Sequence, residues 1–545
     1  MPVRIGVPSC SRRHGGVILG FTSLVSRIAV VHRRIPLSTT RTYRHKDDYL
    51  TVAVTPGAYN KTQVIETAHD YLATTSSGTP GNSKAAVVLA SGGLISWLND
   101  ADFLAALLAP WRGANSEEMS ILTAAVDGVK VQQHGSDLPA TEGLAIMAGP
   151  DVDRLLPGLW EHDTTASSEQ HDSREPPKAY IEFWLPPLPQ DGRPLHVTLP
   201  LANTLFKNGR PHTMFASRLV TEPGAPAMLT DSVEKISQVV VPQRGLQYNS
   251  TVTAPLVAIT KERKIVSGLG NILRQIEGSR QVVRPASTEL EQYIPTLLKA
   301  RSSPKRKVVA IGPLTVWAVI YPKELVEEKQ VEKEIDGQVE VFTKRVIRLK
   351  GADRTGFNFP ARHRAEKGGW ISELAYSQEV TALMPQLLAG GCHIRKVLSG
   401  GGGWGEKQGL LSLDPENRYV APDQEDVESF INSFKGEAGG IVSPGNFVQF
   451  MVQPGYQIEW ETVAEREIYH SSHDFSVVSI GVKDESRVDL SPEDPSKMFV
   501  NLNHFGVTSS KGVFIASDKE QNRKRHESVI ETKMDVPNTR VISTL

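Results

Sequence analysis

The chain contains only two cysteines, Cys10 and Cys392. Two cysteines are too few for a disulfide framework or for a cysteine-rich zinc module. The chain also lacks any apolar run of about 18 residues without a charge, the length that a membrane-spanning helix needs. We therefore expect a protein without a disulfide scaffold and without a transmembrane segment.

The first 43 residues contain no Asp, Glu or Lys. Their charged residues are seven arginines: Arg4, Arg12, Arg13, Arg27, Arg33, Arg34 and Arg41. A basic, hydroxyl-rich segment without acids is typical of a mitochondrial transit peptide. The apolar run at 16–26 leaves two alternatives open, a secretory signal and an uncleaved membrane anchor. Because this run is short and arginines follow it, we predict a transit peptide at 1–43 and a location in the mitochondrion, in the matrix.

The chain also has almost no net charge. The whole chain has 60 basic and 61 acidic residues, a formal net charge of -1. Removal of residues 1–43 takes away seven bases and no acid, so 53 bases face 61 acids and the net charge becomes about -8. A body of this sign does not favour a nucleic acid as partner. The basic cluster Arg301, Lys305, Arg306 and Lys307 lies in a Ser-Pro stretch typical of a solvated linker.

Strand and helix patterns alternate through the first part of the remaining chain. Apolar runs predict strands at 50–55, 85–91, 119–129 and 143–149, and helical periodicity predicts helices at 61–75 and 93–108. Such alternation predicts crossover connections on a sheet that helices cover. The fold class that we expect is therefore α/β and α+β, with an N-terminal strand–helix alternating sheet domain followed by β-rich mixed regions.

The later sequence is organised differently. We expect an α/β domain at 44–247, a β-rich middle region with a charged hairpin at 248–350, and a C-terminal α+β domain at 351–545. The hairpin turns at Asp336-Gly337. Pro295 is expected to break the helical pattern at 289–300 or to delay its start. The stretch 267–271 is expected to be a turn that leads into a short helix ending by Gly278.

A glycine-rich segment at 399–409 is the most unusual feature of the sequence. Consecutive glycines permit close approach of the backbone to a ligand, and their N–H groups can bind an anion. The candidate ligand-binding residues are Gly400, Gly401, Gly402, Gly403, Trp404, Gly405 and Lys407. The helix that a dinucleotide-binding motif requires does not follow, and Glu406 interrupts a Walker pattern. A structural crossing, with Trp404 buried, is the alternative interpretation.

Other motifs give little indication of catalysis. Cys392 and His393 are adjacent on a predicted strand, so their side chains point to opposite faces and cannot form a nucleophile–base pair. His470 and His473 have metal-ligand residue types, but their segment is not convincingly helical. His162 and His171 lie in a polar stretch that predicts a long surface loop. The sequence therefore identifies no catalytic residue, no metal site and no cofactor.

Residues 50–247 resemble the FIST sensory domain. The resemblance is carried by a helix, the strand AAVVLAS, a second helix, the strand ILTAAVDGV, the strand GLAIMAG and the later segment PLANTLFKNG. It implies a sensor module that binds a small ligand, and it assigns no individual site residue to this chain. The C-terminal part, with its glycine-rich segment, resembles no family that we recognise.

Three functions remain open on the sequence. The first is a mitochondrial protein that binds a small molecule or a protein partner without catalysis. The second is an enzyme that binds a phosphate, nucleotide or carboxylate at the 400–409 segment. The third is a mitochondrial gene-expression or assembly factor, against which the acidic charge of the body weighs.

Overall fold

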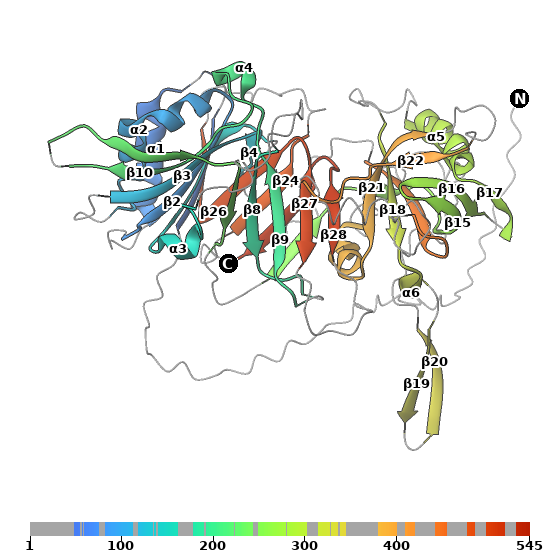
Figure 1. Cartoon of the computed structure of the whole chain (residues 1–545). Coiled ribbons are helices and arrows are strands. Elements are labelled where there is room, and N and C mark those ends of the chain that lie inside the picture. The colour runs from blue at the N-terminus through green and yellow to red at the C-terminus, as the bar shows by residue number, and fades with distance from the viewer. Residues whose placement is uncertain are drawn as a thin grey trace, which may run out of the picture. The chain divides into compact units, whose positions relative to one another are not determined.

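The computed structural model (Figure 1) describes most of the chain from Asp48 to Leu545. The described residues are 48–54, 57, 59–75, 82–112, 118–133, 136–137, 140–161, 178–189, 192–222, 224–242, 249–278, 281–301, 314–326, 329–335, 338–344, 380–400, 409–419, 442–454, 477–484, 498–517 and 530–545. The predicted transit peptide lies outside them, as does the basic cluster beyond residue 301.

A seven-stranded sheet organises the N-terminal part. In spatial order its strands are β11 (Met228–Glu234), β10 (Met214–Val220), β3 (Glu118–Val126), β2 (Ala85–Ser91), β7 (Glu142–Gly149), β1 (Asp48–Val54) and β25 (Phe499–Leu502). β2 and β3 pair in parallel, whereas their other neighbours pair antiparallel. β1 and β2 both run antiparallel to β7, which lies between them. Thus β1, β2 and β3 run in one direction and their carboxyl ends share one edge.

Helices cover one face of this sheet, as the alternating pattern predicts. They are α1 (Lys61–Thr75), the 3-10 helix η1 (Gly92–Asn99) and α2 (Ala101–Leu108), drawn together on one side of the strands (Figure 1). Leu98, Phe103 and Leu107 of these helices pack in one core with the apolar residues of this sheet face. The single helix predicted at 93–108 is instead divided at Asp100, whose carboxylate accepts a hydrogen bond from Phe103 N at 2.9 Å and caps α2.

The other face of the sheet packs into the largest core, which two five-stranded sheets share. One has the order β12 (Ser237–Val240), β8 (Tyr180–Leu185), β9 (Leu195–Pro200), β27 (Val513–Ser517) and β28 (Glu531–Met534). The other has the order β13 (Asn249–Thr253), β29 (Arg540–Thr544), β24 (Val477–Val482), β26 (His504–Ser509) and β4 (Gly128–Val129). Each sheet therefore joins strands from before residue 254 to strands from after residue 476.

Six antiparallel strands form a closed ring, a small barrel. Its order is β23 (Phe447–Val452), β15 (Arg263–Leu269), β16 (Ile272–Glu277), β22 (Leu411–Leu413), β21 (His393–Gly400) and β18 (Val316–Tyr321), and β18 closes the ring on β23. Its interior is a separate aliphatic core. β14 (Val257–Ala258) and β17 (Val283–Pro285) extend its sheet. The short helix expected before Gly278 is thus wrong: that segment is β16, and of the turn expected at 267–271 only Gly270 and Asn271 form the turn between β15 and β16.

Helix α5 (Ser287–Arg301) packs on the barrel core through Leu290 and Leu297. Pro295 lies inside the helix, although the sequence predicted that it would break the helix or delay its start. Proline removes one backbone hydrogen bond. The burial of Leu290 and Leu297 on either side of it offsets this loss, so tertiary packing decides the outcome.

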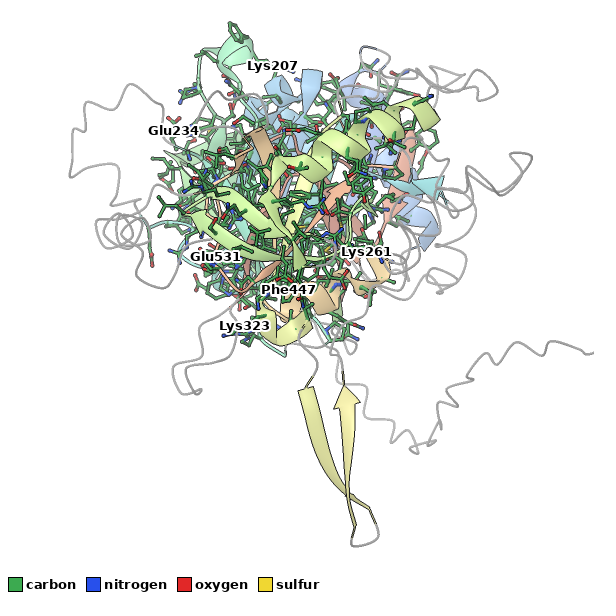
Figure 2. The ribbon with its side chains drawn as sticks, turned by 90° about the vertical axis from the view of Figure 1, so that its right-hand side faces the viewer. Lys207, Glu234, Lys261, Lys323, Phe447 and Glu531 are labelled. Atoms are coloured by element: carbon green, nitrogen blue, oxygen red, sulfur yellow. The ribbon has the colours of Figure 1, made fainter. Side chains whose placement is uncertain are left out.

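The predicted charged hairpin is confirmed. β19 (Lys329–Ile335) pairs antiparallel with β20 (Gln338–Lys344), and Ile335 lies opposite Gln338. The hairpin follows α6 (Lys323–Val326), where Lys323 N donates a hydrogen bond to Asn446 Oδ1 at 3.4 Å; Lys323 is labelled above the hairpin in Figure 2. The remaining short elements are α3 (Val152–Leu155), α4 (Leu205–Asn208), β5 (Gln132–Gln133) and β6 (Ser136–Asp137). Among the described residues, no helix has the length and apolarity to cross a membrane.

The fold is thus mixed and β-rich, with α/β character confined to the β1-to-β3 segment. A polar network joins the barrel to β28. Lys533 Nζ lies 2.8 Å from a carboxylate oxygen of Asp414 and 2.8 Å from one of Glu416. Trp317 Nε1 donates a hydrogen bond to Asp535 Oδ1 at 2.7 Å. Because each of these groups has a partner, we interpret the network as a structural junction.

Candidate functional site

The carboxyl ends of β1, β2 and β3 mark the edge of the seven-stranded sheet at which a ligand site is expected. In sheets with parallel strands, ligands bind in the crevice beyond the carboxyl ends of the strands. The segments that reach this edge here are the residues after β2 and β3 and the residues before the antiparallel strands β7 and β10. The turn between β26 and β27 also lies at this edge, because β26 pairs with β4, which directly follows β3.

The turn after β2 holds a carboxylate of the protein itself. Gly92 has a φ of +61°, and Gly93 N donates a hydrogen bond to Glu142 Oε2 at 3.1 Å. A Cβ on Gly92 would lie 2.0 Å from Glu142 Cδ, so the carboxyl group fills this position. Ser91 Oγ accepts a hydrogen bond from Gly143 N at 3.0 Å. The start of η1 is therefore satisfied internally and leaves no place for an external anion.

The turn after β3 is tied to the turn between β26 and β27. Asp127 Oδ2 accepts hydrogen bonds from the backbone N of Ser510 at 2.8 Å and from its hydroxyl at 2.9 Å. Lys483 Nζ donates to the backbone oxygen of Asp127 at 3.1 Å. Gly512, with a φ of +90°, permits the tight return into β27. These bonds fix the position of Lys511, which lies between Ser510 and Gly512.

Lys511 presents a cation at this edge. Its Nζ donates to the backbone oxygen of Leu201 at 3.1 Å and to the hydroxyl of Tyr419 at 3.3 Å, and lies 5.9 Å from the centre of the Tyr419 ring. All three partners are neutral. Within the part of the chain that the structure describes, Lys511 forms no ion pair.

His212, two residues before β10, is the least explained polar side chain of the edge. It is 7% exposed, yet neither ring nitrogen has a hydrogen-bond partner among the described residues. Burial lowers its pKa, the nearby Glu234 raises it, and Arg210 and Lys511 lower it further. The ring is therefore neutral at pH 7, with one N–H donor and one acceptor nitrogen. Buried polar groups are almost always hydrogen-bonded, so we expect His212 to bond a group other than the described residues.

The neighbours of His212 are, by contrast, fully engaged. Thr204 Oγ1 and Thr213 Oγ1 lie 2.8 Å apart, and Asn208 Nδ2 donates to Thr213 Oγ1 at 2.8 Å. These bonds fold the segment between β9 and β10 on itself around α4. His212 consequently sits in a fixed backbone, and its free nitrogens are not a consequence of a loose loop.

We name Asp127, His212, Lys483, Ser510 and Lys511 the edge cluster. In it the Ser510 hydroxyl bonds a carboxylate that the backbone already engages, and His212 bonds no hydroxyl. A nucleophile with an adjacent base is therefore missing from these five residues. What the cluster offers is a lysine ammonium and a neutral imidazole, groups that bind and orient a small molecule.

The predicted glycine-rich site is described only at its ends. Gly400 is the last residue of β21 and pairs with Leu411 of β22, where a Cβ would lie 2.1 Å from Leu411 Cδ2. Gly409 has a φ of +82° and packs on Pro285. The segment thus connects two neighbouring strands of the barrel. Gly401, Gly402, Gly403, Trp404, Gly405 and Lys407 lie outside the described residues, so a ligand there stays a prediction.

Of the other candidates predicted from the sequence, some lie among the described residues and some do not. Cys392 is buried, which raises the pKa of its thiol, and the ring of His393 lies 2.9 Å from the backbone oxygen of Glu531. The predicted burial of Cys392 is thereby confirmed. His162, His171, His470 and His473 fall outside the described ranges. Among the residues inside those ranges, no group of three or more His, Cys, Asp or Glu side chains is placed to hold a metal ion.

Sequence reasoning missed the edge cluster entirely. His212 and Lys511 belong to turns without a recognisable motif and are brought together by sheet pairing across most of the chain. The one usable indication was the strand–helix–strand pattern of β2 to β3, which predicts functional residues at a carboxyl edge without naming those that come from elsewhere.

Comparison with other proteins adds no assignment to this geometry. No protein-family model, no curated protein and no solved structure matches the chain.

Proposed function

We propose that this protein binds a small molecule, without catalysis, at the edge cluster. The observation that carries the proposal is His212, a buried imidazole whose two nitrogens are unpartnered in the described part of the chain. A hydrogen bond from a ligand to one of these nitrogens would offset the free-energy cost of burying it without a partner. The FIST-like pattern at 50–247 supports the same function, since it implies a ligand-binding sensor module.

A thermal-shift screen with nucleotides, acyl-CoAs and small carboxylates tests this function. We expect at least one compound to stabilise the protein, by about 2.7 kcal/mol when present at a hundred times its Kd. His212→Phe should abolish the shift, because it removes both nitrogens and keeps a ring of similar size. The variant should fold normally, since it deletes a polar group that lacks partners.

His69→Phe is the matched control, because His69 lies on α1 in the helical layer. It should respond to the compound as the unaltered protein does. If every stabilising compound shifts His212→Phe as strongly as the unaltered protein, binding occurs elsewhere. The 400–409 segment would then be the next candidate, tested by Lys407→Ala.

We propose further that the protein acts in the mitochondrial matrix. The support is the arginine-rich, acid-free composition of residues 1–43. Replacement of Arg4, Arg12, Arg13 and Arg27 by glutamate should leave the protein in the cytosol, because the segment loses its cationic character. Microscopy of a C-terminally tagged chain measures this. Unchanged delivery of the variant to mitochondria would contradict the location.

A further inference from the structure

We propose that the edge cluster recognises the oxyanion of its ligand, a carboxylate or a phosphate group, through Lys511 and His212. This inference rests on the proposed function and adds the chemical class of the ligand. It assigns the ammonium of Lys511 as the charged partner and the N–H of the neutral His212 ring as a second donor.

The balance of charge at the edge supports an anion. Both lysines of the cluster donate to neutral oxygens: Lys483 to the backbone oxygen of Asp127, and Lys511 to that of Leu201 and to the hydroxyl of Tyr419. Among the described residues neither lysine forms an ion pair. The ammonium of Lys511 thus lacks a negative partner, and hydrogen bonds to charged groups are the strong ones.

The acids of the same edge are already engaged. Asp127 Oδ2 accepts two hydrogen bonds from Ser510. Glu142 accepts one from Gly93 N. Glu234 forms an ion pair with Arg210 at 2.6 Å. Because none of these carboxylates meets Lys511, an external oxyanion is the group that would complete its bonding.

His212 fixes the direction from which the anion is held. The ring is buried and its backbone is set by the Thr204–Thr213–Asn208 bonds, so its N–H is a donor of defined position. Backbone bonds bring Lys511 to the same place: its Nζ bonds the backbone oxygen of Leu201, Ala202 N bonds that of Ala125 at 3.1 Å, and Ala125 N bonds that of Thr213, the residue after His212, at 2.9 Å. An oxyanion between the two would accept from both, whereas an uncharged ligand would leave the ammonium with neutral partners only.

Two of the other buried charged side chains with an unpartnered polar atom, Arg395 and Glu289, do not offer the same combination. Arg395 is 1% exposed and its Nε is unpartnered in the described part, but Asp414, Glu531 and Asp535 already surround it electrostatically. Glu289 has one free carboxylate oxygen but is an anion paired with Arg263. Neither combines a free cation with a free neutral donor, as Lys511 and His212 do.

Calorimetric titration with three small probes tests the inference. The probes are inorganic phosphate, propionate, and propionamide, which has the shape of propionate without the charge. We expect phosphate or propionate to bind, and propionamide to bind more weakly by about tenfold or more, as loss of a charge-assisted hydrogen bond implies. Lys511→Met, which keeps the apolar stem, should reduce affinity for the anion by a similar factor.

Lys207→Met is the matched control, because Lys207 stands on α4 in the segment that precedes His212 (Figure 2). It removes one positive charge and should leave the affinity unchanged. His212→Phe should weaken binding as Lys511→Met does. Melting curves of all three variants without probe establish that each is folded.

The outcomes separate this inference from the proposed function. Equal binding of propionate and propionamide, or unchanged affinity in Lys511→Met, would overturn the assignment of an oxyanion as the group that the edge cluster recognises. If a neutral compound from the screen needs His212 but not Lys511, the ligand is not an anion although the protein still binds a small molecule there. If neither anionic probe binds at millimolar concentration and no screened anion stabilises the protein, the inference fails as well.

Discussion

Arg263→Ala should lower the free energy of unfolding by about 3–5 kcal/mol, because it leaves a buried carboxylate without its counter-ion. Arg263 Nε lies 2.7 Å from Glu289 Oε1, and the two side chains are 11% and 2% exposed. Arg263 pairs with Val448, whose side chain belongs to the barrel core, so the ion pair lies on the interior face of the barrel. It fastens α5 to β15.

The loss should also depend on pH in a defined direction. Burial raises the pKa of Glu289, and Arg263 opposes that rise. Without Arg263 the folded-state pKa rises further above the unfolded value. The folded state then binds more protons than the unfolded state, so stability falls as pH rises through that interval. The variant should thus be more strongly destabilised at pH 8 than at pH 5.

Denaturant titration at both pH values measures this effect. Lys264→Ala, on the adjacent exposed position of β15, is the control and should change stability by at most about 0.5 kcal/mol. The double variant Arg263→Met, Glu289→Gln should recover much of the loss, because no charge remains buried. A loss in Arg263→Ala no larger than that of the control would show that the ion pair does not hold the helix.

Trp317→Ala should cost about 3–5 kcal/mol, the usual effect of truncating a buried aromatic residue. Trp317 is 1% exposed and lies on the outer face of β18, in the largest core rather than in the barrel interior. Its Nε1 donates to Asp535, whose pKa burial raises and this hydrogen bond lowers. The side chain therefore joins the barrel to the segment after β28 by both packing and a polar bond.

Trp317→Phe separates the two contributions. It keeps most of the packing and leaves Asp535 without its donor, for a loss of about 1.5–3 kcal/mol. Denaturant titration of both variants and of Trp184→Phe, at an exposed position of β8, gives the comparison. If Trp317→Phe is as stable as the Trp184 control, the bond to Asp535 contributes nothing to the junction.

The strongest sequence predictions concern segments whose patterns are local. The helix at Lys61–Thr75 and the strand Ala85–Ser91 have the predicted bounds. Each is marked by apolar periodicity or by an unbroken apolar run, which the local chain specifies. The pairing of β19 with β20 was likewise predicted from a local feature, the Asp-Gly dipeptide in the sequence between them.

Predictions failed where long-range contacts outweigh a local preference. Pro295 stays inside α5 because Leu290 and Leu297 are buried against the barrel. The 272–277 segment is a strand because β15 and β22 offer backbone partners on both sides. The residues within each segment do not by themselves predict these partners.

The sequence by itself determined the strand–helix order from β1 to β3, the burial of Cys392, the hairpin of β19 and β20, and the excess of acidic over basic residues in 44–545, since each depends on neighbouring residues or on composition alone. Only the tertiary structure decided the closing of the barrel, the sharing of sheets between early and late strands, and the approach of the turns that carry His212 and Lys511 to one sheet edge. The reason is that a strand's partner is chosen by burial and backbone hydrogen bonding across hundreds of residues. A short window of sequence therefore does not predict which strands pair.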